Sequence, residues 1–401
     1  MRLQNALGRT LHLGYCTNVH PAEDLDGIVG QLDRYAAAVR RHLDTDLLGV
    51  GLWLAAPVTA ALAGDRAARH RLRGELDSRG LEVVTLNGFP YRSFHAPRVK
   101  HAVYRPDWAE PERLAYTLSL AHILAELMPD DAAYGSISTL PLAWRTPWDG
   151  ARRSACSQAL EQLAAGLAEI ESRTGRTVRV GFEPEPGCAV ETTAQAADLL
   201  ADAGAGRLGV CLDLAHLACA WEEPARALER LQAAGLPVVK VQLSAALEVA
   251  DPVAAREMLT PYAEPRFLHQ VRRPGCADAD DPADASHAAD DLDEALSRDL
   301  PGPWRVHYHV PLHADPEPPL AATVPVLRSA LDLLIGGPDA PCDHFEVETY
   351  TWGVLPPARR PRTEAALAEG IAAELAFARN ELQVRGAVPV PRHTPTTEVT
   401  A

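Results

Sequence analysis

The sequence lacks the cysteine patterns that define disulfide-rich or thiolate-zinc domains. Its seven cysteines are odd in number, are scattered over 401 residues and never form a C-x-x-C pair. This distribution is typical of reduced thiols in a cytoplasmic protein. The segment Met1–Gly14 also lacks the continuous apolar stretch of a secretion signal, so we expect a cytoplasmic location.

Long apolar runs and concentrated positive charge are missing as well. The uncharged stretch Leu47–Gly64 contains Pro57 and divides into a strand-like and a helix-like part, so we expect no membrane span. The formal net charge is -16 without a compensating basic patch, which disfavours nucleic acid as a partner. With 47% hydrophobic and 23% charged residues, the composition is that of a globular protein with a large core.

Short β-rich runs alternate with segments of helical periodicity. Strands are predicted at Leu11–Cys16, Leu48–Leu54, Leu81–Asn87, Tyr134–Thr139, Thr177–Glu183, Leu208–Asp213, Val238–Leu243 and Phe345–Tyr350. Helices are predicted at Leu25–His42, Ala67–Arg79, Pro111–Leu127, Ala151–Thr174, Thr193–Ala203, Pro224–Ala234, Ala322–Leu334 and Thr363–Leu382. Strand–helix units in series predict an α/β fold, the closed (β/α)₈ TIM barrel, with a doubly wound open sheet as the main alternative.

Two further β-like segments lie between the seventh and eighth predicted strands. Arg266–Arg272 and Trp304–Leu312 either form a hairpin on the barrel rim, or one of them replaces a predicted strand. The acidic segment Cys276–Leu300 lacks the glycine of an EF-hand loop, so we expect a solvated, mobile loop. The expected organisation is a single barrel domain at 1–385, a rim hairpin with its acidic loop at 266–312, and a disordered tail at 386–401.

Alternation along the strands predicts which polar side chains point into the barrel. The inward set is Arg179, Glu183, Glu185, Cys211, Asp213, Lys240, Gln242, Glu346, Glu348 and Tyr350, and one face of Trp304–Leu312 carries Arg305, His307 and His309. Several ionised carboxylates in one cavity repel each other and lose hydration, so a divalent cation is expected to compensate them. Oxygen ligands favour Mg²⁺, Mn²⁺ or Ca²⁺, and an added imidazole moves the preference toward manganese, cobalt, iron or zinc.

Each candidate also has a purely structural interpretation. The inward glutamates could form ion pairs with the basic residues Arg179, Lys240 and Arg305. Asp213 could cap the helix that contains His216. Each rim histidine could be an ordinary hairpin residue, and Asn87 and His95 could belong to turns.

A series of motifs, in order along the chain, resembles the metabolite traffic protein EboE family. They are YCTNVHP (Tyr15–Pro21), LNGFPYRSFH (Leu86–His95), VKHAVYRPDW (Val99–Trp108), GSISTLPL (Gly135–Leu142), FEPEPGC (Phe182–Cys188), VCLDLAH (Val210–His216), KVQLSAAL (Lys240–Leu247), FLHQVR (Phe267–Arg272), WRVHYHVPL (Trp304–Leu312) and FEVETYTWGVLP (Phe345–Pro356). The match runs from about Leu13 to Gly353. The resemblance implies a xylose-isomerase-like TIM barrel, similarity to sugar phosphate isomerases and epimerases, and a link to the processing or export of secondary-metabolite precursors.

The resemblance also implies a metal site at the ends of the fifth to eighth strands. The glutamate, aspartate, histidine and acid of the wider superfamily correspond here to Glu183, Asp213, Gln242 and Glu348. His216 matches a histidine that contacts substrate. Gln242 departs from the pattern, because an amide is a weaker ligand than imidazole. Either His269 or His309 then replaces it, or metal binding is weak or lost.

These observations favour a metal-dependent isomerase or epimerase that acts on a sugar, sugar phosphate or cyclitol. Glu183 or Glu348 is the expected proton-transfer base, and the expected oxyanion partners are His216, Lys240 and Arg305. Further substrate contacts are expected from Asn87, His95, Glu185, His269, His309 and Glu346. The alternative is a non-catalytic metabolite-binding or carrier protein, for which other proteins of its pathway are candidate partners. A nuclease on this scaffold would need a basic groove that the composition does not supply.

Overall fold

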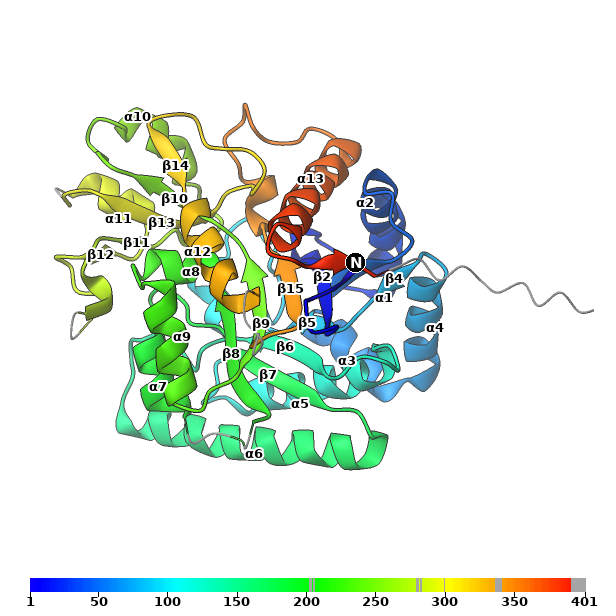
Figure 1. The fold of residues 1–401 in the computed structure, drawn as a ribbon. Coiled ribbons are helices and arrows are strands. Elements are labelled where there is room, and N and C mark those ends of the chain that lie inside the picture. The colour runs from blue at the N-terminus through cyan, green and yellow to red at the C-terminus, as the bar shows by residue number, and fades with distance from the viewer. Residues whose placement is uncertain are drawn as a thin grey trace, which may run out of the picture.

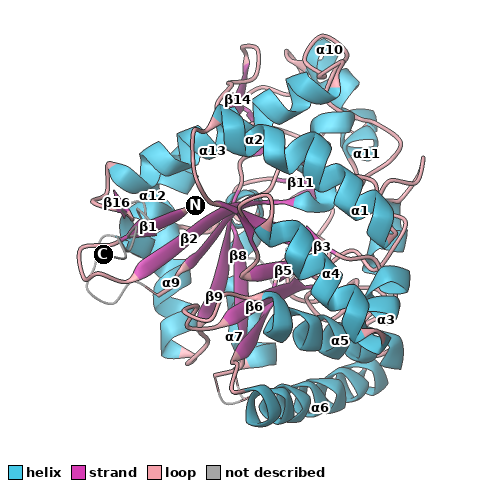
Figure 2. Cartoon of the chain, turned by 90° about the vertical axis from the view of Figure 1, so that its right-hand side faces the viewer, coloured by secondary structure: helices cyan, strands magenta, loops and turns pink. Residues whose placement is uncertain are grey.

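A closed barrel of parallel strands forms the centre of the computed structural model, which describes residues 1–201, 204, 206–278, 281, 283–298, 300–335 and 341–390 (Figures 1 and 2). The strands are β2 (Thr10–Cys16), β3 (Leu48–Trp53), β4 and β5 (Leu81–Glu82 and Thr85–Asn87), β6 (Gly135–Thr139), β7 (Val178–Phe182), β8 (Leu208–Asp213), β9 (Val238–Leu243) and β15 (His344–Val347). Strand β2 pairs in parallel with both β3 and β15, which closes the ring. The predicted barrel is therefore confirmed, with the third strand split in two.

Helices surround the barrel and cover the outward faces of its strands (Figure 2). They are α1 (Leu25–Gln31), which continues through η2 (Leu32–Ala36) into α2 (Ala37–His42), then α3 (Ala56–Gly64), α4 (Arg66–Asp77), α5 (Pro111–Leu127), α6 (Gly150–Thr174), α7 (Thr193–Leu200), α8 (Leu214–Cys219), α9 (Pro224–Ala233), α12 (Val324–Ile335) and α13 (Glu364–Gln383). Local sequence sets their ends. Asp149 caps α6 by accepting from the Arg152 backbone N–H, and Gly175 ends it at φ 69°, a conformation that glycine adopts without steric cost.

A second, antiparallel sheet lies beside the barrel (Figure 1). Its first strand along the chain comes directly after β9. Its order is β12 (Ala288–Ala289), β11 (Val271–Arg272), β13 (Trp304–His309), β10 (Ala246–Val249) and β14 (Leu320–Ala322). The two predicted rim segments do pair, through β11 and β13. The sheet, however, spans 246–322, because β10 and β14 join it from outside the predicted 266–312. Opposite β10 the register of β13 shifts, so that His309 faces Ala246 while Val306 faces Leu247.

Part of the acidic segment is folded, so the expectation of a mobile loop throughout is wrong. It contains η5 (Cys276–Asp278), β12 and α11 (Leu292–Ser297). Asp291 accepts from the backbone N–H of Leu292 and of His269, and its carboxylate also binds Lys100. These bonds hold the segment against the rest of the chain. Residues 279, 280, 282 and 299 lie outside the described residues.

The chain beyond Gly386 begins with a short strand rather than the expected disorder. Strand β16 (Val388–Pro389) pairs with β1 (Arg2–Gln4), which in turn pairs with β2. The remainder of the expected tail, 391–401, lies outside the described residues. Short helical turns complete the fold at η1 (Thr17–Val19), η3 (Lys100–Tyr104), α10 (Arg256–Leu259), η4 (Thr260–Tyr262) and η6 (Tyr350–Gly353).

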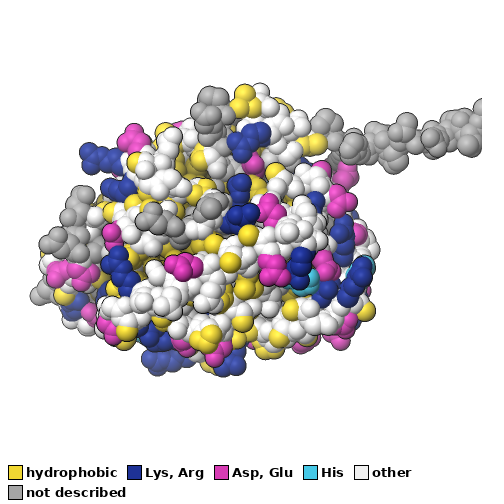
Figure 3. All heavy atoms as spheres, turned by 90° about the horizontal axis from the view of Figure 1, so that it is seen from below, with side chains coloured by type: hydrophobic (Ala, Val, Ile, Leu, Met, Phe, Trp, Pro, Cys, Tyr) yellow, Lys and Arg dark blue, Asp and Glu magenta, His cyan; other side chains and the backbone are white. Residues whose placement is uncertain are grey.

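The surface and the thiols agree with the composition. Within the described ranges, no helix is both long and apolar enough to cross a lipid bilayer. On the face shown in Figure 3, basic and acidic side chains are intermingled. All seven cysteines are buried and free, as expected for reduced thiols, because burial keeps a thiol away from oxidants and partners.

Candidate metal centre and active site

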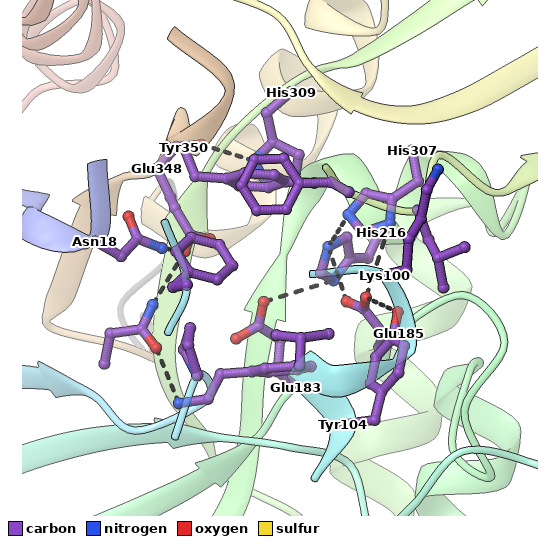
Figure 4. Close-up of a pocket in the computed structure, with 17 residues that line it drawn as sticks. Asn18, Lys100, Tyr104, Glu183, Glu185, His216, His307, His309, Glu348 and Tyr350 are labelled. Atoms are coloured by element: carbon purple, nitrogen blue, oxygen red, sulfur yellow. Dashed lines mark hydrogen bonds and ion pairs between the residues drawn. The ribbon is translucent and has the colours of Figure 1, made fainter. Parts of the chain in front are cut away.

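A cavity opens at the carboxyl ends of the barrel strands (Figure 4). The cavity and its mouth together enclose about 500 Å³, which is within the range of small-molecule sites. Its polar lining consists of Asn18, Asn87, Lys100, Tyr104, Glu183, Glu185, His216, His307, His309, Glu348 and Tyr350. Enzymes on this barrel use this end of the strands as the active site, so the cavity is the candidate functional site.

Asp213 ends β8 and contributes one occupied and one free oxygen. Its Oδ1 accepts hydrogen bonds from the backbone N–H groups of Ala215 and His216 at 2.8 and 2.9 Å and from Ser244 Oγ at 2.8 Å. The predicted helix-capping role is therefore correct for this oxygen. Its Oδ2 is buried without a hydrogen-bond partner among the described residues. One carboxylate thus caps α8 and still offers a ligand atom.

Glu183 and Glu348 bring two further carboxylates to the cavity from β7 and β15. Glu348 Oε1 accepts from the side-chain amides of Asn18 and Asn87 at 2.7 and 3.0 Å. Glu183 Oε1 lies 3.6 Å from His216 Nδ1, and its Oε2 has no hydrogen-bond partner within the described part of the chain. Each glutamate is at most 5% exposed. Both therefore direct oxygen atoms into a space that excludes most water.

Three histidines converge on the same space (Figure 4). His216 comes from α8, whereas His307 and His309 both come from β13 of the second sheet. His309 Nδ1 contacts the Glu348 carbonyl oxygen at 2.7 Å, and its Nε2 lies 4.0 Å from Asp213 Oδ1. His216 Nε2 lies 2.8 Å from His307 Nε2 and 3.2 Å from Glu185 Oε2. The second sheet thus completes a cluster that the barrel begins.

The electrostatics of these side chains by themselves are unfavourable. Burial, and then repulsion from Asp213, raises the pKa of Glu348 to about 8. Burial and the neighbouring carboxylates also raise the pKa values of Glu183 and Glu185 well above the ordinary range. Burial lowers the pKa of His216 to about 4. A low-polarity cavity therefore disfavours both charged acids and charged imidazoles, unless a cation compensates the acids.

The donor set fits a divalent cation. Asp213, His309 and Glu348 can each place one ligand atom within 4.8 Å of the other two, and the same holds for Glu183, Glu185 and His216. Asp213 Oδ2 and His309 Nε2 are buried and have no other partner among the described residues. One imidazole with carboxylate oxygens suits Mn²⁺, Co²⁺ or Zn²⁺. Asp213, His309 and Glu348 are the residues that would hold the ion.

Several predicted site residues lie elsewhere. Gln242 is completely buried, accepts a hydrogen bond from Cys211 Sγ and does not line the cavity. Of the two rim histidines considered as its replacement, His309 reaches the cluster, whereas His269 is occupied by Glu264 at 3.0 Å and by the His307 carbonyl at 2.9 Å. The predicted direct ligand roles of Gln242 and His269 are therefore not supported by their contacts.

The remaining candidates also divide between cavity and scaffold. Asn87 lines the cavity, whereas the His95 ring contacts the Asn18 carbonyl at 2.7 Å and lines a neighbouring surface pocket. Arg305 pairs with Glu248 at 2.6 Å and stacks on a tryptophan ring outside the cavity. The last two candidates, Lys240 and Glu346, form a buried ion pair at 2.5 Å in the barrel interior, which is the structural alternative considered from the sequence.

The sequence interpretation left five polar lining residues without a role, and one of them, Lys100, pairs with Asp291. Asn18 and Tyr104 bind Glu348 and Glu185, and Tyr350 lies beside His309. His307 is the most important omission, because it lies against His216. Its signal was present in the alternation of Trp304–Leu312, which places His307 and His309 on one face.

Comparisons with known proteins agree with the barrel. The family described as xylose isomerase-like TIM barrel matches residues 46–263, more than half of the 401-residue chain. A candidate sugar phosphate isomerase/epimerase from Anabaena variabilis is 16% identical with a TM-score of 0.53, over 94% of this chain and all of that one. A xylose isomerase-like TIM barrel protein from Mycobacterium smegmatis, in complex with magnesium, is 13% identical with a TM-score of 0.50, over 93% and 98%. No curated protein matches the chain significantly.

Proposed function

Since the chain belongs to the xylose isomerase-like TIM barrel family, we propose that it is a divalent-metal-dependent isomerase or epimerase of a sugar, sugar phosphate or cyclitol. The observation that carries the proposal is the convergence of buried ligand atoms without other partners, Asp213 Oδ2 and His309 Nε2, beside Glu348. Burying such atoms without a partner costs roughly 1–3 kcal/mol each, and a cation removes that cost.

Asp213, His309 and Glu348 would hold the cation, which would supply Lewis-acid polarisation of a substrate carbonyl or hydroxyl group. Glu183 removes a proton from the carbon next to the carbonyl, because it lines the cavity and its Oε2 has no hydrogen-bond partner among the described residues. Asn18 and Asn87 hold Glu348 in place through its Oε1. The apolar walls, which include Phe89, exclude water and strengthen these interactions.

The biological role that we propose follows the EboE resemblance. The protein would act in the cytoplasm on a small polar precursor of a secondary metabolite, together with other proteins of that pathway. The motifs around Asn18, His216 and His309 support this assignment, since they contain cavity residues. A polar cavity with an apolar wall also suits a polyol better than a large hydrophobic compound.

Solvent deuterium exchange tests the reaction directly. The purified protein, loaded with Mn²⁺, is incubated in D₂O with ketoses, ketose phosphates and a keto-inositol, and proton NMR follows deuterium entering the carbon next to the carbonyl. We expect Asp213→Asn to lose the ion held by Asp213, His309 and Glu348, and to lose exchange. Glu183→Gln should keep metal while exchange falls about 10²–10⁴-fold. The matched control is Asp198→Asn, at a mostly exposed residue near the end of α7. It should keep both metal and exchange.

Two outcomes would contradict the proposal. Full exchange activity in Glu183→Gln would remove that carboxylate from proton transfer. Thermal stabilisation of the wild type by one of these compounds, without exchange of any of them, would favour a carrier protein.

A further inference from the structure

The contacts of His216 and His307 fix where each ring carries its proton. His216 Nδ1 lies 3.0 Å from the Pro184 carbonyl oxygen, which can only accept. His216 Nδ1 must therefore be the donor. A neutral imidazole has one N–H group, so the Nε2 atom of His216 carries a lone pair.

His307 is fixed in the same way through Gln270. Gln270 Nε2 donates to the Pro186 carbonyl oxygen at 2.8 Å and to the Tyr104 hydroxyl at 2.9 Å, and this hydroxyl donates its own proton to Glu185 at 2.9 Å. Both partners require an N–H group, so the amide cannot be reversed. Its Oε1 consequently faces His307 Nδ1 at 2.8 Å, and that nitrogen must donate.

Two lone pairs therefore face each other across the 2.8 Å between His216 Nε2 and His307 Nε2. A protonated Glu185 could donate to His216 Nε2 at 3.2 Å, but His307 Nε2 would still face that nitrogen without a proton. An imidazolium would supply the proton, yet both rings are only 4% exposed, and such burial disfavours the charged ring. In every neutral arrangement one electron pair is left opposed.

We propose that His216 Nε2, His307 Nε2 and Glu185 bind a second divalent cation of the zinc class, next to the position of Asp213, His309 and Glu348. Two imidazoles and one carboxylate with an open position are a common donor set for Zn²⁺ and also accept Co²⁺. The inference depends on the proposed function only in assuming that a first ion lies at Asp213, His309 and Glu348. The two positions share no ligand atom. His309 lies within ligand range of both histidines, so the two ions would share one cavity.

Gln270 and Pro184 then act as positioning residues for this second ion. They hold the two Nδ1–H groups and so leave both Nε2 lone pairs free to bind a ligand, as outer-shell partners of metal-bound histidines do. Tyr104 does the same for Glu185, because its hydroxyl occupies Oε1 and leaves Oε2 toward the histidines. The residues around the pair are therefore arranged for a cation rather than for a histidine–histidine hydrogen bond.

The test counts cations. The purified full-length protein is dialysed against Co²⁺ or Zn²⁺, and elemental analysis measures the ions bound per chain. We expect two in the wild type, one in His307→Asn, one in Asp213→Asn and none in the double variant. Asparagine at 307 can still donate to Gln270 through its amide but lacks the Nε2 lone pair. His101→Asn, at an exposed histidine on η3, is the matched control and should keep two.

The outcomes separate this inference from the proposed function. One ion in the wild type that Asp213→Asn removes and His307→Asn retains would overturn the second position and leave the first. One ion in the wild type that His307→Asn removes and Asp213→Asn retains would support the second position and overturn the first. If His307→Asn does not fold, Glu185→Gln answers the same question, since its amide can donate to His216 Nε2 and block the cation there. Two ions in Glu185→Gln would contradict the proposed donor set.

Discussion

The buried ion pair between Lys240 and Glu346 allows a quantitative test of whether these two residues stabilise the core or take part in catalysis. Both side chains are at most 1% exposed, and Lys240 Nζ lies 2.5 Å from Glu346 Oε2. Lys240 Nζ also donates to Ser138 Oγ at 3.2 Å, whereas neither Glu346 oxygen has a well-oriented hydrogen bond within the described residues. The attraction to Lys240 is therefore the main compensation for the buried carboxylate.

Replacing Lys240 by methionine leaves that carboxylate unpaired, and removing one partner of a buried pair costs about 3–5 kcal/mol. The double variant Lys240→Met/Glu346→Met replaces the pair with apolar groups of similar volume. It should cost less than the sum of the single variants by roughly 2–3 kcal/mol, the upper range for residues in contact. Urea unfolding at pH 7, followed by circular dichroism, measures the free energies of unfolding.

The same variants distinguish a structural lysine from a catalytic one. We expect Lys240→Met to keep the bound metal of the wild type, because neither residue lines the cavity. A cost below about 1 kcal/mol, or strictly additive single variants, would refute the account of the pair. Loss of activity at unchanged stability would restore the oxyanion role that the sequence suggested.

Two further predictions concern the ends of the barrel. Burial alone would raise the pKa of Glu82, but His12, then the N-terminal ammonium group, and then Arg2 outweigh it and lower the pKa to about 2. Glu82→Gln should therefore lower the free energy of unfolding at pH 7. Its difference from the wild-type value should shrink by about 1.4 kcal/mol per pH unit as pH falls below about 4.5. A pH-independent difference in urea titrations would contradict this. Gly187→Ala should lower the melting temperature, because φ is +88° and the new Cβ would lie 2.2 Å from Trp144; an unchanged melting temperature would show that the loop adjusts.

The barrel was predictable because its signals are local. Strands such as Val178–Phe182 alternate in sequence with period two, and helices such as α6 and α13 begin at a side-chain N-cap. The inward direction of Glu183, Asp213 and Glu348 follows from the same alternation. Parallel pairing then brings these strand ends together without any further information.

The remaining features depend on contacts between distant segments. Alternation predicts that Lys240 points inward, but it does not show that Glu346 neutralises it below the cavity. The choice between His269 and His309 depends on the docking of the second sheet, where Glu264 occupies His269. The opposed lone pairs of His216 and His307 depend on hydrogen bonds from three separate segments. These side-chain contacts join segments that are distant in sequence, so the sequence pattern alone does not predict them.

The register shift between β10 and β13 has a consequence for tolerance to insertions and deletions. Surface loops usually accommodate length changes easily, but β13 is the middle strand of the second sheet. Its side chains alternate, so adding or deleting one residue before His307 would exchange its two faces. Tyr308 would then turn toward the carboxylates, and both imidazoles would leave them. The pairing of β13 with β10 is already irregular here, with a register shift between Ala246 and Leu247. Chain length within the second sheet is therefore constrained by the side chains that β13 sends into the cavity.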